Sequence, residues 1–188
     1  MRPQKIDDIE LINKIIPLLR NRGFAGTSIQ DLSEVTGLKK ASLYHRFPGG
    51  KEDMVLAALK YVSMQVRKEI LEVLTDNTLA PKKRLEKGLQ GIARYYENGK
   101  SPCLFRSLSL ESGQNTLISE LNVGMVKWLE AFTELGIDMK YDLKKAKDKA
   151  MNVLISIQGS LVVCQTLKTT VPFTDALEII RNIYSSEN

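Results

Sequence analysis

Apolar residues recur along most of the chain at intervals of three and four, the spacing that places them on one face of an α-helix. The first such stripe consists of Ile9, Ile12, Ile16 and Leu19. Alternating runs of β-branched residues, which are typical of half-buried strands, are absent from the sequence. The pattern therefore predicts an all-α protein.

Glycine, proline and N-cap residues divide this pattern into separate predicted helices. They cover residues 7–22, 27–35, 39–45, 51–74, 81–98, 104–112, 117–135, 142–167 and 172–184. Two capping boxes compete at the start of the second helix, Thr27 with Gln30 and Ser28 with Asp31. The first helix is predicted to end at Gly23, because glycine tolerates the left-handed conformation of a helix C-cap.

Residues 27–47 read TSIQDLSEVTGLKKASLYHRF, and two short predicted helices within them flank Thr36-Gly37-Leu38. Two short helices joined by a three-residue turn that contains glycine are typical of a helix-turn-helix. Apolar contacts are expected to lock the two helices together, made by Leu32, Val35, Leu38, Leu43 and Phe47. A plain pair of surface helices in an all-α core is the alternative, because short helix pairs are common.

The second helix of this pair is predicted to present a polar face to solvent. At 100° per residue, Ala41 and His45 point away from its buried centre. Lys40 and Tyr44 lie on one flank of this face, and Ser42 lies on the other. A basic group, hydroxyl groups and a small residue on one helix face can meet base edges and phosphates in the major groove of DNA.

The distribution of charge supports a polyanionic partner. The net charge of the chain is +5, and residues 1–51 hold nine lysines and arginines against five acidic residues, which gives +4. The remaining 137 residues therefore carry only +1. A basic N-terminal segment on a nearly neutral body is typical of a protein that binds nucleic acid at one end.

Composition excludes several other classes of protein. Hydrophobic residues make up 43% and charged residues 26%, which are ordinary values for a globular protein and far from those of disordered chains. The chain has no run of eighteen apolar residues and no signal peptide at its N-terminus, so we expect no membrane span and a cytoplasmic location.

The sequence predicts neither a metal site nor a cofactor. Cys103 and Cys164 lie far apart, and the chain contains one histidine, too few ligands for a zinc site. Both cysteines are expected to be small buried residues in a reducing compartment. A redox role for Cys103, which lies near Arg106, is the alternative.

Over residues 9–60 the sequence resembles the DNA-binding region of the TetR family of bacterial repressors. The resemblance depends on the block TGLKKASLYHRF followed by KEDM. The phrases FPGGKEDM and PCLFRSLSLE resemble the LmrA/YxaF-like subgroup, although Leu104, Phe105 and Arg106 stand where that subgroup tends to have small residues. The resemblance implies a DNA-binding domain at residues 1–50 and an effector-binding and dimerisation domain at residues 51–188.

Family members bind double-stranded operator DNA, and the resemblance implies roles for matching positions. Phosphate contacts are implied for Ser28, Tyr44 and Lys51. Contacts with base edges are implied for Gln30, Lys40, Ala41 and Tyr44. Either kind of contact is implied for Lys39, Ser42 and His45. For His45, a solvated surface position is the alternative, and a lone histidine without a nucleophile partner does not indicate catalysis.

The last two predicted helices are apolar on more than one side. A helix of this kind must be buried on two sides. In so small a body the second side is expected to meet another copy of the chain, and Gly159 and Ser160 would let the backbones approach closely. We therefore predict a homodimer formed through the last two helices, as is usual in the resembled family. A purely intramolecular core is the alternative.

Large, polarizable side chains in the body are candidates for a chamber that binds a small apolar or aromatic effector. They are Met64, Tyr95, Tyr96, Phe105, Leu108, Met125, Trp128 and Phe132. The same residue types also fill ordinary cores, so a DNA-binding regulator without a ligand is one rival hypothesis. A helical enzyme is the second rival, and the sequence lacks the metal-ligand spacing, phosphate-binding glycine loop or nucleophile–base pair that would favour it.

Overall fold

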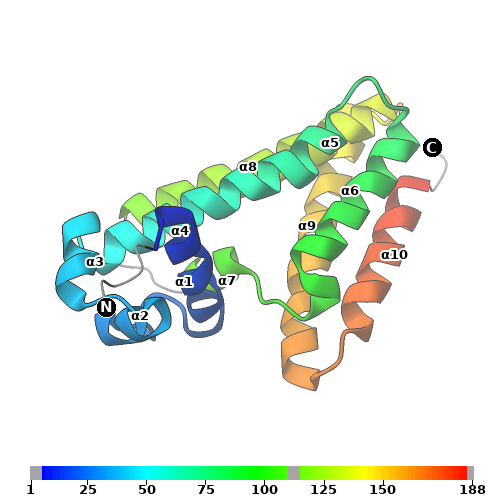
Figure 1. Ribbon diagram of the computed structural model, residues 1–188. Coiled ribbons are helices and arrows are strands. Elements are labelled where there is room, and N and C mark those ends of the chain that lie inside the picture. The colour runs from blue at the N-terminus through cyan, green and yellow to red at the C-terminus, as the bar shows by residue number, and fades with distance from the viewer. Residues whose placement is uncertain (1–5, 110–114, 186–188) are drawn as a thin grey trace. The chain divides into compact units, whose positions relative to one another are not determined.

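The computed structural model describes residues 6–109 and 115–185, and within them every regular element is helical (Figure 1). The prediction of an all-α protein is therefore confirmed. The chain forms two compact units, each described below by itself. Unit 1 comprises Met1–Ser63 and Leu104–Glu120, and unit 2 comprises Met64–Cys103 and Leu121–Asn188. The boundary predicted at residue 50 separates a DNA-binding domain from an effector-binding and dimerisation domain. This functional division stays a prediction.

Unit 1 contains the helix-turn-helix. Its elements are α1 (Asp8–Arg22), α2 (Ile29–Thr36), α3 (Lys40–Arg46), α7 (Leu104–Ser109), most of α4 (Lys51–Val66) and the start of α8 (Asn115–Asp138). The core is aliphatic, and its fully buried members include Leu11, Ile15, Leu19, Leu32 and Leu43. The last three residues of the helix predicted at 104–112 lie outside the described residues.

Two apolar residues expected inside unit 1 lie at its surface. Ile9 is 58% exposed, because the buried face of α1 is centred on Ile15 and Ile9 lies about 120° from that centre. Val35 is exposed as well. Thr36 takes the inward position at the end of α2, and it can be buried because its hydroxyl donates to the Leu32 carbonyl at 2.6 Å.

Unit 2 contains α6 (Pro81–Tyr95), α9 (Leu143–Leu167), α10 (Val171–Ser185) and most of α8. Helices α9 and α10 pack against each other, and α10 also contacts α6 (Figure 1). Aromatic rings fill much of the core between these helices. Phe132 lies 6.1 Å from Trp128 and 6.2 Å from Tyr184 between ring centroids, and the Tyr184 hydroxyl donates to the Phe132 carbonyl.

The segment predicted as one helix over residues 51–74 contains an irregularity. After α4 the chain forms a π-helical turn, Arg67–Leu71, and then α5 (Glu72–Leu74). Gly91 of α6 approaches this turn so closely that a Cβ atom there would lie 2.7 Å from the Glu69 carbonyl oxygen. Single π-helical turns inside α-helices are often found at functional positions.

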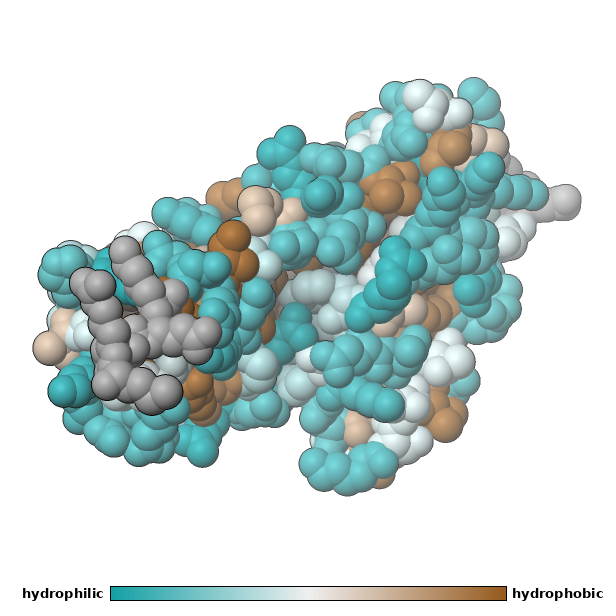
Figure 2. Space-filling view, in the orientation of Figure 1, coloured by the Kyte–Doolittle hydropathy of each residue, from teal (hydrophilic) through white to brown (hydrophobic). Residues whose placement is uncertain are grey.

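Helix α9 is apolar on its inner and its outer face. By length and composition alone it is long and apolar enough to cross a membrane. This was not expected from the sequence, which has no run of eighteen apolar residues. Its inner face is buried in unit 2, with Ala150, Leu154, Ile157 and Leu161 among the buried residues. Apolar side chains also reach the surface of unit 2, where Figure 2 shows separate apolar patches on a largely hydrophilic face.

Candidate nucleic-acid interface

The start of α2 is fixed by the second of the two predicted capping boxes. The Ser28 hydroxyl accepts from the Asp31 backbone N–H at 3.1 Å, and the Ser28 backbone N–H donates to the Asp31 carboxylate at 2.8 Å. Hydrogen bonds from Ser28 are the main reason why the pKa of Asp31 is lowered, and the Arg22 guanidinium at 2.8 Å adds to the effect. Thr27 is buried instead, and its hydroxyl donates to the Gly23 carbonyl.

The turn between α2 and α3 has the predicted glycine geometry. Gly37 adopts the left-handed conformation with φ 70° and ψ 10°, and its backbone N–H donates to the Ser33 carbonyl at 2.9 Å. Lys39 then returns to extended backbone and precedes α3. Because a residue with a Cβ atom rarely adopts the conformation of Gly37, the glycine sets the direction in which α3 leaves the turn.

Helix α3 has one buried residue and an otherwise exposed surface. Leu43 is fully buried, as predicted, and it anchors the helix to unit 1. The predicted polar face is exposed, and it comprises Lys40, Ala41, Ser42, Tyr44 and His45; Lys39, directly before the helix, is exposed as well. Residues 35–51 contain no acidic residue, so nothing on this segment neutralises its lysines. The resulting surface is basic and able to donate hydrogen bonds, which suits a groove of duplex DNA.

Tyr44 rests on the backbone of Gly50. A Cβ atom at Gly50 would lie 3.1 Å from Cε1 of the tyrosine ring, and Gly50 has a positive φ of 67°. The tyrosine nevertheless remains 48% exposed. Gly50 therefore contacts one part of the ring and leaves the rest of the side chain open to solvent.

Lys51 has an intramolecular role that the sequence did not indicate. Its ammonium group donates to the Phe24 carbonyl at 2.9 Å and lies 4.0 Å from the centroid of the Phe24 ring. These contacts connect the start of α4 to the loop between α1 and α2. An ammonium group has three donors, so this arrangement leaves hydrogen-bonding capacity for a phosphate.

Two further polar residues of the segment have partners within unit 1. Gln30 donates through Nε2 to the Glu34 carboxylate at 2.9 Å. Arg46, which contributes to the basic charge of the segment, donates to the Ile6 carbonyl at 2.6 Å and to Asp8 at 3.2 Å. The free positive charge of the interface is therefore concentrated on Lys39 and Lys40 more than the count of basic residues suggests.

The residues predicted to line one effector chamber are distributed over both units. Phe105 and Leu108 belong to α7 in unit 1, where α7 packs against α1. The other six, Met64, Tyr95, Tyr96, Met125, Trp128 and Phe132, belong to unit 2. Among these, Met64 is exposed, whereas Tyr96, Trp128 and Phe132 are buried. Burial favours a core role for these three rings, and their role in ligand binding stays a prediction.

Both cysteines are buried, as predicted. Cys103 accepts a hydrogen bond from the Tyr96 hydroxyl at 3.6 Å. Burial is the largest cause of the strongly raised pKa of Tyr96, so the phenol donates rather than ionises. Among the described residues no group of three or more histidine, cysteine or acidic side chains is placed to hold a metal ion.

Comparison with protein families identifies the helix-turn-helix segment. Residues 11–58 match the family described as bacterial regulatory proteins, tetR family. The HTH-type transcriptional regulator LmrA of Bacillus subtilis is 23% identical over 172 residues, which cover 87% of this chain and 88% of that protein. The uncharacterized HTH-type transcriptional regulator YxaF of the same organism is 22% identical, covering 82% of this chain and 83% of that protein.

Solved structures show the same fold over nearly the whole chain. A TetR transcriptional regulator from Legionella pneumophila has a TM-score of 0.83 at 16% identity, with 95% of this chain and 98% of that chain covered. A TetR transcriptional regulator from Chloroflexus aurantiacus has a TM-score of 0.78 at 21% identity, with 95% and 94% covered. All of these similar proteins are described as transcriptional regulators.

Proposed function

We propose that this chain, a transcriptional regulator of the TetR family with a DNA-binding helix-turn-helix, is a repressor that binds a palindromic operator as a homodimer and is released by a small effector. The observation that carries the proposal is the surface of α3, which is basic, exposed and anchored by a single buried leucine. A protein of this function works in the cytoplasm, where it has access to the chromosome.

In this proposal α3 enters the major groove. Lys40, Ala41 and Tyr44 meet base edges, helped by Gln30 at the start of α2. Phosphates are held by Ser28, Tyr44 and Lys51, and Lys39, Ser42 and His45 complete the surface. The capping box of Ser28 and the contacts of Lys51 with Phe24 hold two of these groups in place before DNA arrives.

Fluorescence anisotropy with labelled DNA from upstream of the protein's own gene tests the DNA-binding part of the proposal. We expect tighter binding to one inverted repeat than to scrambled DNA by a factor of about 10³ or more. Equal affinity for the two sequences would refute operator recognition, whereas no binding to either would refute the assignment of the interface.

Support for the homodimer comes from a symmetric ridge on the outer face of α9. Four exposed apolar residues lie at intervals of four on either side of a central glycine, in the order Met151, Ile155, Gly159, Val163 and Leu167. A Cβ atom built on Gly159 would meet nothing within 4 Å, so this position is open to an approaching helix. A second copy related by a two-fold axis at Gly159 would place Met151 beside the partner's Leu167 and Ile155 beside the partner's Val163.

The α9 ridge is tested by cross-linking. Under mild oxidation, Gly159→Cys should form an intermolecular disulfide readily, because the residue lies on the proposed axis. Asp148→Cys is the matched control, since eleven residues along the helix would place it roughly 33 Å from its mate. Equal cross-linking of the two variants would refute the axis. Burial of Cys103 and Cys164 limits background reaction.

Effector release is the most detailed part of the proposal. The helical segment from Lys51 to Leu74 begins in unit 1 and continues into unit 2. It contains the π-helical turn at Arg67–Leu71. A ligand that binds among the aromatic residues near Trp128 and tilts this segment would change the spacing of the two α3 helices, which should be about 34–36 Å for successive major grooves. A coupling of about 1–3 kcal/mol corresponds to roughly 5–150-fold weaker operator binding.

A panel of planar aromatic compounds tests effector release, with Trp128 emission and operator affinity followed together. We expect stoichiometric quenching and weaker operator binding by the same compound. Compounds that bind and leave operator affinity unchanged would refute the tilting mechanism. A panel that never binds would favour the rival, a DNA-binding regulator without a ligand.

A further inference from the structure

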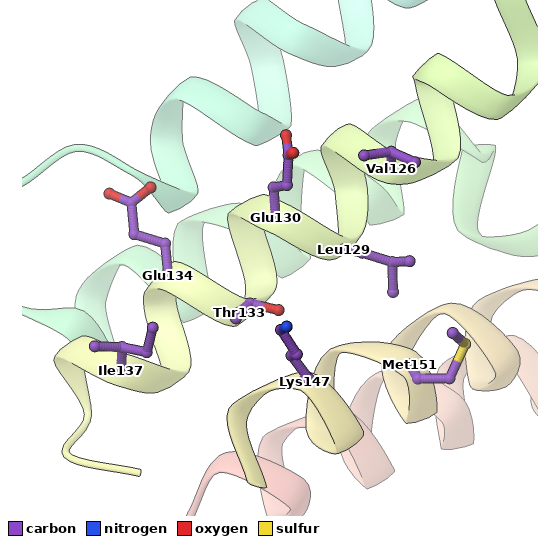
Figure 3. A pocket seen from close by; sticks show the side chains of 8 residues that line it. All are labelled: Val126, Leu129, Glu130, Thr133, Glu134, Ile137, Lys147 and Met151. Carbon is purple, nitrogen blue, oxygen red and sulfur yellow. The ribbon is translucent and has the colours of Figure 1, made fainter. Parts of the chain in front are cut away.

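A groove in unit 2 lies between α8 and α9, outside the aromatic core of that unit. It has a volume of about 440 Å³, and its lining residues are Val126, Leu129, Glu130, Thr133, Glu134, Ile137, Lys147 and Met151. Leu129 and Met151 face the space between the two helices, and Lys147 extends from α9 toward Thr133 (Figure 3). None of the eight residues predicted to bind the effector is among the lining residues.

The groove combines apolar walls with a single positive charge. Val126, Ile137 and Met151 are exposed although they are apolar, so this surface is stabilised when an apolar group covers it. Glu130 and Glu134 point away from α9, and the charge that extends into the groove is therefore the ammonium group of Lys147. The occupant that suits these walls has apolar side chains and a group that accepts hydrogen bonds from an ammonium group.

The α9 ridge leads into this groove. Residues four positions apart on a helix are rotated by about 40°, so the ridge winds by roughly 160° around α9 between Met151 and Leu167. Met151 lies on the side of α9 that faces α8, because it lines the groove. Leu167 lies on the side that faces α10, about five whole turns after Lys149, whose ammonium group donates to the Ile183 carbonyl of α10. The ridge therefore joins the α8 side of one end of the helix to the α10 side of the other end.

A two-fold axis at Gly159 brings these two ends together. The pairing of the ridges places Met151 beside the partner's Leu167, and one helical turn further Lys147 lies beside the partner's Val171. The turn between α9 and α10 of the second copy then lies over the groove. The chain's own turn cannot reach this groove, because residues 147 and 167 are roughly 30 Å apart along α9.

The turn between α9 and α10 has the chemistry that the groove requires. Leu167 is 64% exposed and Val171 is 59% exposed, so both can cover an apolar wall. The backbone N–H groups of Lys168 and Thr169 both donate to the Cys164 carbonyl. The carbonyls of residues 165–167, at the negative end of the helix dipole, are therefore left to water or to another donor. A lysine ammonium group is such a donor.

We propose that the groove between α8 and α9 receives the α9–α10 turn of a second copy of the chain. The partner's Leu167 and the partner's Val171 cover its apolar walls, and Lys147 donates to the last carbonyls of the partner's α9. This inference rests on the homodimer of the proposed function and deepens it, since α8 joins the last two helices in the interface. Each groove is complete only when the partner's turn fills it, and the two-fold axis makes two such contacts in each dimer.

A pair of cysteines tests the groove contact. Thr133→Cys combined with Val171→Cys should give an intermolecular disulfide under mild oxidation, because the two positions meet only between subunits. Each single variant is a matched control, since the axis would place a cysteine more than about 30 Å from its mate. On non-reducing gels the double variant should cross-link at least tenfold faster than either single variant. Equal rates for the double and the single variants would overturn the proposal.

The Gly159→Cys variant separates failure of the groove contact from failure of the homodimer. A disulfide through Gly159→Cys without one in the double variant would overturn the groove contact and leave the homodimer in place. Absence of both disulfides would overturn the homodimer and the groove contact together.

The role of the ammonium group is tested by the affinity of the dimer. Lys147→Gln should weaken dimerisation about fivefold, through loss of its hydrogen bonds to the partner's carbonyls. Lys127→Gln, which neutralises an exposed lysine of α8 outside the groove lining, is the control and should leave the dimer affinity unchanged. Sedimentation equilibrium of both variants and the wild type measures the difference. Equal affinities of all three proteins would overturn the contact of Lys147 with the partner's α9.

Discussion

Helices α3 and α9 are both exposed along much of their length, yet their exposed residues differ in kind. The outward face of α3 carries a lysine, hydroxyl groups, a histidine and an alanine, Lys39 lies directly before it, and residues 35–51 contain no carboxylate. The outward face of α9 carries Ile155, Val162 and Val163 beside Gly159. The polar face of α3 stays hydrated until a polyanion displaces the water. The apolar face of α9 is stabilised whenever another apolar surface covers it.

This difference teaches that exposure alone does not identify an interface, and that the chemistry of the exposed atoms identifies the partner. Scattered exposed apolar residues are ordinary on protein surfaces. A ridge of them at a constant interval, symmetric about an open glycine, is better explained by a second copy of the same chain. A basic face without acidic neighbours is better explained by phosphate groups.

The largest expected effect comes from placing a charge on the apolar face. Ile155→Glu should weaken dimerisation at least 100-fold, about 3 kcal/mol, because the carboxylate would have to lose its water in the interface. Ile9→Glu is the matched control, since Ile9 is 58% exposed, Ile155 is 61% exposed and α1 carries no part of the α9 ridge. Analytical ultracentrifugation measures the dimer affinity of both variants. Equal dimer affinity of the two variants would refute the interface.

The basic face of α3 should respond to loss of a charge without any loss of stability. Lys40→Ala is expected to weaken operator binding by about 1–3 kcal/mol and to relax preference at one operator position. Because the side chain is exposed, urea unfolding should be unchanged. Lys82→Ala, which removes an exposed lysine of α6, is the control and should leave operator affinity unchanged.

Lys51→Ala should combine an effect on DNA binding with an effect on folding. Loss of a phosphate contact should lower the slope of log affinity against log salt by about 1 for all DNA sequences. Loss of the contacts with Phe24 should also lower the free energy of unfolding by about 1 kcal/mol. An unchanged salt slope with lowered stability would show that Lys51 has a purely structural role.

The smallest effect is expected at the cap of α2. The folded-state pKa of Asp31 is lowered, so its contribution to stability is present above its ordinary value of 3.8 and is lost as the pH falls through the lower folded value. In Asp31→Asn this part of the acid dependence should be missing, whereas the wild type should lose stability below about pH 4. Thermal unfolding from pH 6 to pH 3 measures the difference. Parallel curves would show that the hydrogen bonds with Ser28 contribute nothing to stability.

Local signals were sufficient for the DNA-binding segment. The turn at Gly37 and the buried position of Leu43 follow from interactions within a few residues of the chain, whereas the sequence left two capping boxes open and the structure selected Ser28 with Asp31. The exposed face of α3 then follows from helical periodicity alone, because one fixed inward residue determines which others point outward. The sequence therefore predicted the class of fold and the outward orientation of the candidate DNA contacts.

The tertiary structure decided what depends on distant residues. Ile9 and Val35 have the right chemistry for a core, but the packing of neighbouring helices left them outside it. The contact of Lys51 with Phe24 joins residues 27 positions apart, and the groove between α8 and α9 requires both helices to be in place. Periodicity assigns a residue to a face of its own helix, whereas only packing determines which faces are covered and which charges find partners.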